Sequence, residues 1–263
     1  MEPVIDRLAI TAQLDRSPAY RGTVHEDATA RAQGFRGALI PGAFLIDYAS
    51  RLALSRWGQA WLSAGTFAAR FRRPVHHGDA LLLRLGAAGG GQEPLTIDVE
   101  GTERVLEGAL GLDATAPLVP EPHFEPHREP RPVMDPSRLQ VGMRFGTAST
   151  LLSADDLAVS RAAMGQGDPA YGGGLAHLAA LVRVAMGDVL RTFAWPAAPV
   201  FTAVEGRILG PVRAGQRLRT SAEVVETFER KGRHYFVSEE WLWADERPAL
   251  MQRRTNLYAG ASS

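Results

Sequence analysis

Long apolar stretches and short alternating ones follow each other along the chain. The stretches at 41–57 (PGAFLIDYASRLALSRW) and 175–190 (LAHLAALVRVAMGDVL) are long and mostly apolar, and each predicts a buried helix. Shorter stretches bounded by turns predict strands at 7–14, 66–87, 94–102, 104–114, 143–152, 201–229, 233–244 and 247–260. One long helix with a run of antiparallel strands predicts an α+β fold, in which the helix covers one sheet face.

The two halves of the chain follow the same order of elements. "RPVHHGDALLLR", which begins at 73, matches "GPVRAGQRLRT", which begins at 210. "ALIPGAFL", which begins at 38, matches "GLAHLAAL", which begins at 174. Two independent matches at nearly the same spacing indicate an internal repeat. We therefore predict two tandem copies of one α+β unit.

A proline-rich segment separates the copies. Seven of the 17 prolines lie between 117 and 136, and proline cannot continue a helix or a central strand. We predict a first unit at 1–116, an extended linker at 117–138 and a second unit at 139–263. His123 and His127 lie in this linker, where the prolines forbid the helix that would pair them on a metal. The glycine-rich run 86–94 leads into a strand, which predicts a hairpin loop and not a phosphate-binding loop.

Composition removes several classes of function. The chain has 29 basic and 29 acidic residues, and a net charge of zero argues against nucleic acid or an anionic membrane as the partner. It has no cysteine, which excludes disulfides and thiolate chemistry. The start, MEPVIDRLAI, lacks the basic segment of a signal peptide, and no apolar run approaches the roughly 20 residues of a membrane span. We predict a cytoplasmic protein.

Asp47 is out of place in the first long helix, because carboxylates are seldom buried without a partner. One interpretation is that Asp47 serves an active site. Two others are that it faces solvent at a helix edge, or that it pairs with Arg51 one turn along the helix.

The stretch "VHEDATARAQGFRGALIPGAFL" resembles the MaoC-type enoyl-thioester hydratases and dehydratases. Their motif, D-x-N-P-x-H-x-D-x-x-x-A, is followed by G-F and by an I-x-x-G turn into a helix. The matching positions are His25, Asp27, Gly34, Phe35, Ile40 and Gly42, and "PV-x-x-GD" at 74–79 is also typical of the family. The resemblance implies a tandem, or double, hotdog fold, in which an antiparallel sheet wraps around a central helix in each half.

This sequence departs from the family motif at important positions. Where the family has its catalytic aspartate the chain has Tyr20, and at the asparagine position it has Gly22. In the second half, "GQGDPAY" is similar to a remnant of the same motif, with Gln166 in place of the aspartate and Tyr171 in place of the histidine. The resemblance therefore implies a single active site, marked by His25.

The helix also resembles that of fatty-acid synthase 3-hydroxyacyl-carrier-protein dehydratases. Their helix begins P-G and carries a catalytic carboxylate at the fifth position after the glycine, which here is Asp47. Their histidine lies at the ninth position before that glycine, where this chain has Gln33. The equivalent of Asp47 in the second copy is Arg183. The two resemblances together imply His25 and Asp47 as the catalytic residues.

These residue types suit chemistry on an enoyl thioester. Histidine, with a reference pKa of about 6.5, can move a proton to or from Cα, and a desolvated carboxylate can orient water or protonate a leaving hydroxyl. Backbone N–H groups at the helix start, near Gly42 and Ala43, could stabilise charge on the thioester oxygen. The substrate-binding residues expected around the pair are Gly42, Ala43, Gln33, Tyr48, Gln166 and Tyr171. The plain alternative for His25 is a surface histidine in an acidic loop.

Three functions remain open on the sequence alone. The first is addition to, or elimination from, an enoyl thioester of coenzyme A or a carrier protein, with a nucleophile that need not be water. The second is a hotdog thioesterase that uses the helix carboxylate to activate water. The third is a non-catalytic acyl-binding subunit. We expect no metal or other cofactor, and either a monomer or a homodimer.

Overall fold

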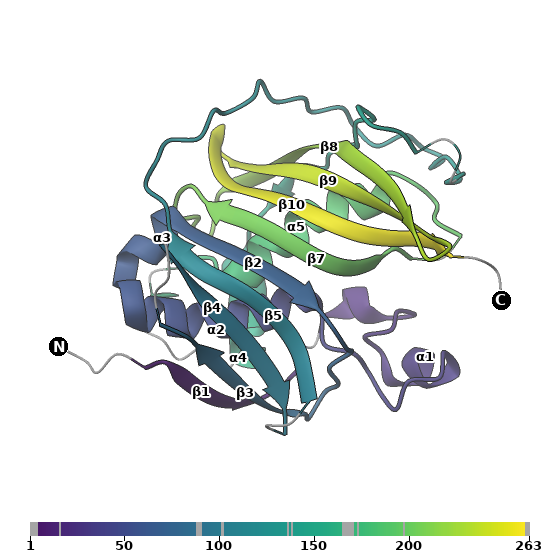
Figure 1. The fold of residues 1–263 in the computed structure, drawn as a ribbon. Helices are drawn as coiled ribbons and strands as arrows, with labels where there is room; N and C mark the ends of the chain where they lie inside the picture. Colours follow the sequence, from purple (N-terminus) through teal and green to yellow (C-terminus); the bar gives the residue numbers. More distant parts are fainter. Residues whose placement is uncertain are drawn as a thin grey trace.

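The protein forms one continuous antiparallel sheet backed by helices on one face (Figure 1). The structure is a computed structural model, and it describes residues 5–15, 17–87, 91–100, 103–135, 137, 139–164, 171–172, 174–196 and 198–260. The strands are β1 (Arg7–Thr11), β2 (Gly65–Phe71), β3 (Ala80–Leu85), β4 (Gln92–Val99), β5 (Glu103–Leu112), β6 (Thr150–Leu151), β7 (Val200–Ile208), β8 (Arg217–Arg230), β9 (Arg233–Ala244) and β10 (Arg247–Gly260).

The order of these strands shows the repeat. It runs β1-β3-β4-β5-β2-β7-β10-β9-β8-β6, so the first five strands come from the first half and the last five from the second. β3 begins at Ala80 and β8 at Arg217, two positions that the first sequence match aligns with each other. The predicted α+β fold with an internal repeat is confirmed, and β3 and β4 pair as the hairpin expected around the glycine run.

Two long helices, α2 (Gly42–Trp57) and α5 (Leu178–Arg191), lie next to each other behind the sheet (Figure 1). Their first residues are aligned by the second sequence match. The shorter helices are η1 (Pro18–Tyr20), α1 (Asp27–Ala32), η2 (Gly58–Ala60), α3 (Trp61–Ala64) and α4 (Ala154–Ala163). No helix in the described part of the chain is long and apolar enough to cross a membrane.

One hydrophobic core connects the two halves. Phe44 and Leu52 of α2 are fully buried in the same cluster as Val182 of α5 and Leu250 of β10. Burial of one such side chain contributes about 1.5–3 kcal/mol relative to exposure. The halves therefore share their main source of stability.

The proline-rich segment packs on the second half. His123 hydrogen-bonds the carbonyl of Ala222 through Nε2 at 2.9 Å, and Phe124 meets Trp243 edge to face at 6.2 Å. His127 Nε2 lies 3.4 Å from the carboxylate of buried Asp188 on α5. The two linker histidines thus fasten the linker to strand and helix, and the described residues contain no cluster of three or more metal-ligating side chains.

A buried polar network lies among the inward-facing residues of β9 and β10. The guanidinium of Arg254 donates to Glu240 at 2.7 and 2.9 Å and to Asn256 at 2.6 Å, and Glu240 also accepts from Ser238 and Gln252 at 2.6 Å. All five residues are at most 1% exposed. Each charge is offset by a partner, which is the condition for keeping an ion pair in a core.

Removal of one partner from this network should be costly. We expect Arg254→Met to lower the free energy of unfolding by about 3–5 kcal/mol, because Glu240 would stay buried without a counter-charge. The matched control is Arg253→Met on the same strand. Arg253 pairs with Glu239 at 2.8 Å and is half exposed, so its loss should cost less than about 1 kcal/mol. Urea denaturation of both variants measures the difference, and equal effects would contradict the prediction.

Candidate active site

His25 lies in the loop between η1 and α1, against the segment that leads into α2. Its Nδ1 is 2.8 Å from the carbonyl oxygen of Leu39, and its ring is 5.1 Å from that of Tyr20. A carbonyl oxygen can only accept, so Nδ1 carries the hydrogen and Nε2 is the basic nitrogen of the neutral ring. The fold therefore fixes both the orientation and the tautomer of His25.

The surroundings of His25 favour its neutral form. Burial lowers the pKa of His25 below its ordinary value, and the positive charge of Arg183 lowers it further. The hydrogen bond to Leu39 and the negative charge of Asp15 act in the opposite direction. With the net shift downward, Nε2 can accept a proton near neutral pH.

Arg183 reaches this cluster from the second half of the chain. Its Nη1 donates to Asp15 Oδ2 at 2.9 Å, and its guanidinium carbon lies 5.2 Å from the ring centre of Tyr20 and 5.4 Å from that of Phe44. Sequence reasoning named neither Asp15 nor Arg183 as a site residue. The only signal was that Arg183 is the repeat equivalent of Asp47.

Asp47 is fully buried where α2 meets the start of α5. Its Oδ2 lies 3.1 Å from Nδ1 of His177, and its Oδ1 accepts the N–H of Ala179 at 3.3 Å. His177 is the N-cap of α5 and is also fully buried. The alternative in which Asp47 faces solvent is therefore wrong, and both of these contacts reach the other half of the chain.

His25 and Asp47 take their contacts from two different groups of residues. His25 lies with Tyr20, Asp15 and Arg183, whereas Asp47 lies with His177 and Ala179. Tyr48, next to Asp47 on α2, is fully buried, and its hydroxyl bonds the backbone N–H and carbonyl of Gln13 at 3.0 and 3.1 Å. Burial raises the pKa of Tyr48 to about 12, with smaller contributions from Asp47 and Asp15. Tyr48 is thus close enough to one carboxylate of each group to feel its charge.

The start of α2 is covered by aromatic rings. A Cβ on Gly42 would lie 2.8 Å from Cζ of Phe71 and 3.0 Å from Cδ1 of Phe201, and Ala43 is buried. Gly42 was expected to bind the substrate through backbone N–H groups at the helix start. In the structure, glycine is needed there because the two rings, 4.8 Å apart, occupy the space that a side chain would need.

The other expected binding residues are dispersed. Gln33 is exposed as the C-cap of α1. Tyr171 is buried, with its ring 6.5 Å from that of His177 and its carbonyl accepting from Arg161 at 2.7 Å. Gln166 lies outside the described residues. Tyr171 therefore belongs with Asp47 and His177, and Gln33 lies at the surface.

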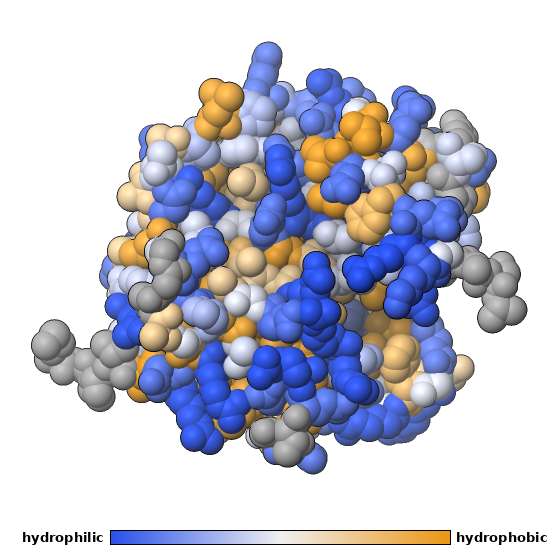
Figure 2. Space-filling view, viewed as in Figure 1, coloured by the Kyte–Doolittle hydropathy of each residue, from blue (hydrophilic) through white to orange (hydrophobic). Residues whose placement is uncertain are grey.

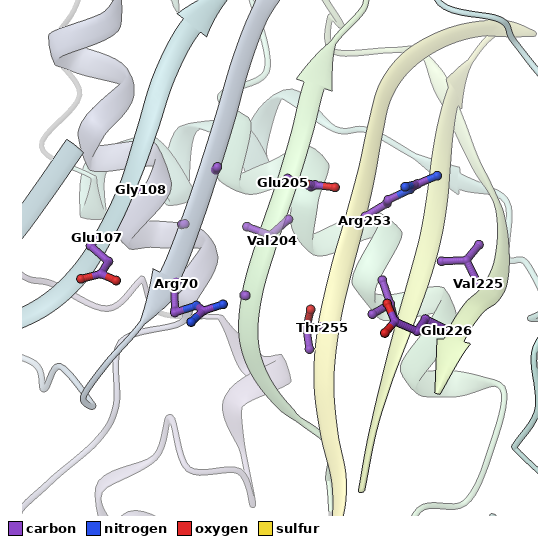
Figure 3. Close-up of a pocket in the computed structure, with 13 residues that line it drawn as sticks. Arg70, Glu107, Gly108, Val204, Glu205, Val225, Glu226, Arg253 and Thr255 are labelled. Carbon is purple, nitrogen blue, oxygen red and sulfur yellow. The ribbon is translucent and has the colours of Figure 1, made fainter. Parts of the chain in front are cut away.

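A hollow of about 750 Å³ lies on the helix-free face of the sheet, over β5, β2, β7, β10, β9 and β8 (Figures 2 and 3). Figure 3 shows Glu205 and Arg253 side by side on β7 and β10, and Arg70 and Glu107 farther along the same face. Neither His25 nor Asp47 lines it. The hollow is separate from the acid–base groups described above.

Stability should depend on the protonation of His25. Because its pKa is lowered in the folded state, only the unfolded chain gains a proton as the pH falls below about 6.5, and this lowers the free energy of unfolding. We expect a smaller loss of stability between about pH 7.5 and about pH 5.5 in His25→Gln than in wild type. Urea denaturation at both pH values measures this loss, and an equal loss in the two proteins would contradict the prediction.

Solved structures with the same architecture were found, although no family model and no curated protein matches the sequence. They include a MaoC-like dehydratase with a TM-score of 0.58 and 13% identity over 96% of this chain and 97% of that one. Rv0216, a conserved hypothetical protein from Mycobacterium tuberculosis with a double hotdog fold, has a TM-score of 0.58 and 15% identity over 95% and 96%. A putative thioesterase from Novosphingobium aromaticivorans has a TM-score of 0.52 and 16% identity over 97% and 96%. At these identities the likeness concerns the fold, and the chain has the double hotdog fold that its motifs imply.

Proposed function

We propose that the protein acts on an acyl thioester of coenzyme A or a carrier protein, by addition to or elimination from an enoyl thioester. The observation that carries the proposal is His25, a half-buried imidazole whose hydrogen bond to Leu39 leaves Nε2 as a base. The double hotdog fold, which this chain has in common with a MaoC-like dehydratase, supports the same class of substrate. Proteins with one fold can catalyse different reactions, so the proposal depends mainly on the residues of the site.

In the elimination direction, Nε2 of His25 would take the proton from Cα of a 3-hydroxyacyl thioester. The electron pair of that C–H bond would form the Cα–Cβ double bond, and the hydroxyl would leave as water after receiving a proton from the imidazolium. Addition is the reverse, with the nucleophile giving its proton to Nε2. Any nucleophile with a transferable proton fits this scheme, so an amine or alcohol can take the place of water.

Asp47 remains in the proposal as the second candidate for proton transfer. A thioesterase that works through this carboxylate would need a water molecule beside it. Asp47 has no exposed surface, and its two oxygens already face Nδ1 of His177 and the N–H of Ala179. These contacts favour addition or elimination at His25 over hydrolysis at Asp47.

An enoyl thioester of pantetheine tests the function directly. The protein would be incubated with it in the presence of water, and then with added simple amines, while the ultraviolet band of the enoyl group and free thiol are followed. We expect loss of the band without thiol release. His25→Ala should slow this loss by at least about 100-fold, the usual contribution of a general base.

Asp47→Asn is the matched variant, because asparagine keeps the shape of the side chain and removes its charge. Thiol release that disappears only in Asp47→Asn would support the thioesterase alternative. Wild-type protein that gives neither product would contradict the proposal, and so would a His25→Ala variant that is folded by circular dichroism and fully active.

A further inference from the structure

Arg183 is held in place on three sides, although it belongs to the half of the chain without His25. Asp15 pairs with its Nη1 at 2.9 Å, and the rings of Tyr20 and Phe44 lie 5.2 and 5.4 Å from its guanidinium carbon. Its side chain is 23% exposed and that of Asp15 only 3%. A guanidinium with an ion-pair partner and two aromatic neighbours is fixed in a way that a solvated surface arginine is not.

Tyr20 connects this pair to His25. Its ring lies 5.1 Å from the imidazole and 5.2 Å from the guanidinium, so it contacts both. Tyr20 stands where the MaoC-type motif has an aspartate. Asp15, slightly earlier in the chain, is the buried carboxylate that reaches this neighbourhood, and its Oδ1 accepts the N–H of Ser17 at 3.4 Å.

We propose that Asp15 and Arg183 form a positioning pair for His25, in which the first half supplies the carboxylate and the second half the cation that balances it. The inference rests on the proposed function only in giving His25 the role of base. The electrostatic effect of Asp15 and Arg183 on the His25 imidazole does not depend on that role. The repeat equivalent of Arg183 in the first half, Asp47, makes the reciprocal contact with the second half.

The two members of the pair change the pKa of His25 in opposite directions. The positive charge of Arg183 lowers the pKa of His25 and the negative charge of Asp15 raises it, beside the larger effect of burial. The ring of His25 also lies against that of Tyr20, whose own pKa is raised by burial, and beside the Leu39 carbonyl. Loss of either charge alone should therefore leave the other uncompensated.

Nuclear magnetic resonance titration of His25 tests the pair without any substrate. In full-length protein the imidazole signal would be assigned by its absence in His25→Gln. We expect the pKa of His25 to rise in Arg183→Gln, to fall in Asp15→Asn, and to lie between these values in the double variant. Shifts of the same sign in both single variants, or none in either, would overturn the proposal.

Two further variants separate charge from folding. Arg183→Lys keeps the charge, so it should hold the pKa of His25 closer to wild type than Arg183→Gln does. Arg191→Gln removes another arginine of α5, one that pairs with Asp188 at 3.0 Å and is half exposed, and it should leave the titration unchanged. If Arg191→Gln shifts the His25 signal as far as Arg183→Gln does, the effect is general and the pair is refuted.

The pH dependence of thioester turnover then distinguishes failure of the pair from failure of the function. The acid limb of kcat/KM should move to higher pH in Arg183→Gln and to lower pH in Asp15→Asn, in step with the titration. Titration shifts without any turnover in wild type would sustain the pair and refute the proposed function. If wild type turns over the thioester but neither the His25 titration nor the acid limb of kcat/KM moves in the variants, the proposed function is supported and the pair is refuted.

Discussion

The antiparallel pairing of β2 with β7 joins the two half-sheets, and the packing of the two halves depends on it. These strands are the inner edges of the two half-sheets, and their register runs from Thr66 opposite Arg207 to Arg70 opposite Ala203. The sheet is continuous across this pair, and both long helices lie on the same face of it, side by side. With this arrangement one hydrophobic core joins the two halves, and side chains of α2 and α5 can reach across to the opposite half.

Polar contacts connect each long helix with the opposite half of the chain. Asp47 of α2 reaches the first turn of α5, where its Oδ1 accepts the backbone N–H of Ala179 and its Oδ2 lies 3.1 Å from Nδ1 of His177. Arg183 of α5 reaches Asp15 in the first half. A helix start offers unsatisfied N–H groups and a partial positive charge, so a carboxylate there is well placed even without exposure. The burial of Asp47 is therefore explained by its contacts with the start of α5.

The sequence predicted the architecture because repeats and strand patterns are local in the chain. The positions aligned by the two sequence matches reappear as the starts of α2 and α5 and of β3 and β8. The partner of Asp47 was not predictable, because it depends on how two helices from opposite halves of the chain face each other. Asp15 lies in no sequence motif, and only the structure shows that it is next to Arg183. The domain limits and the catalytic roles of His25 and Asp47 stay predictions.

A tandem chain can do something that a symmetric dimer of single units cannot. In a two-fold dimer the same residue must occupy both equivalent positions. Here one of them is Asp47 and the other Arg183, so the two crossing contacts have opposite charge. A carboxylate at 183 would add a second negative charge beside Asp15 and raise the pKa of His25, since nearby negative charges favour the protonated form of an imidazole. Arginine at that position instead balances Asp15 and lowers the pKa of His25. This asymmetry between the copies fits the proposed role of His25 as a base.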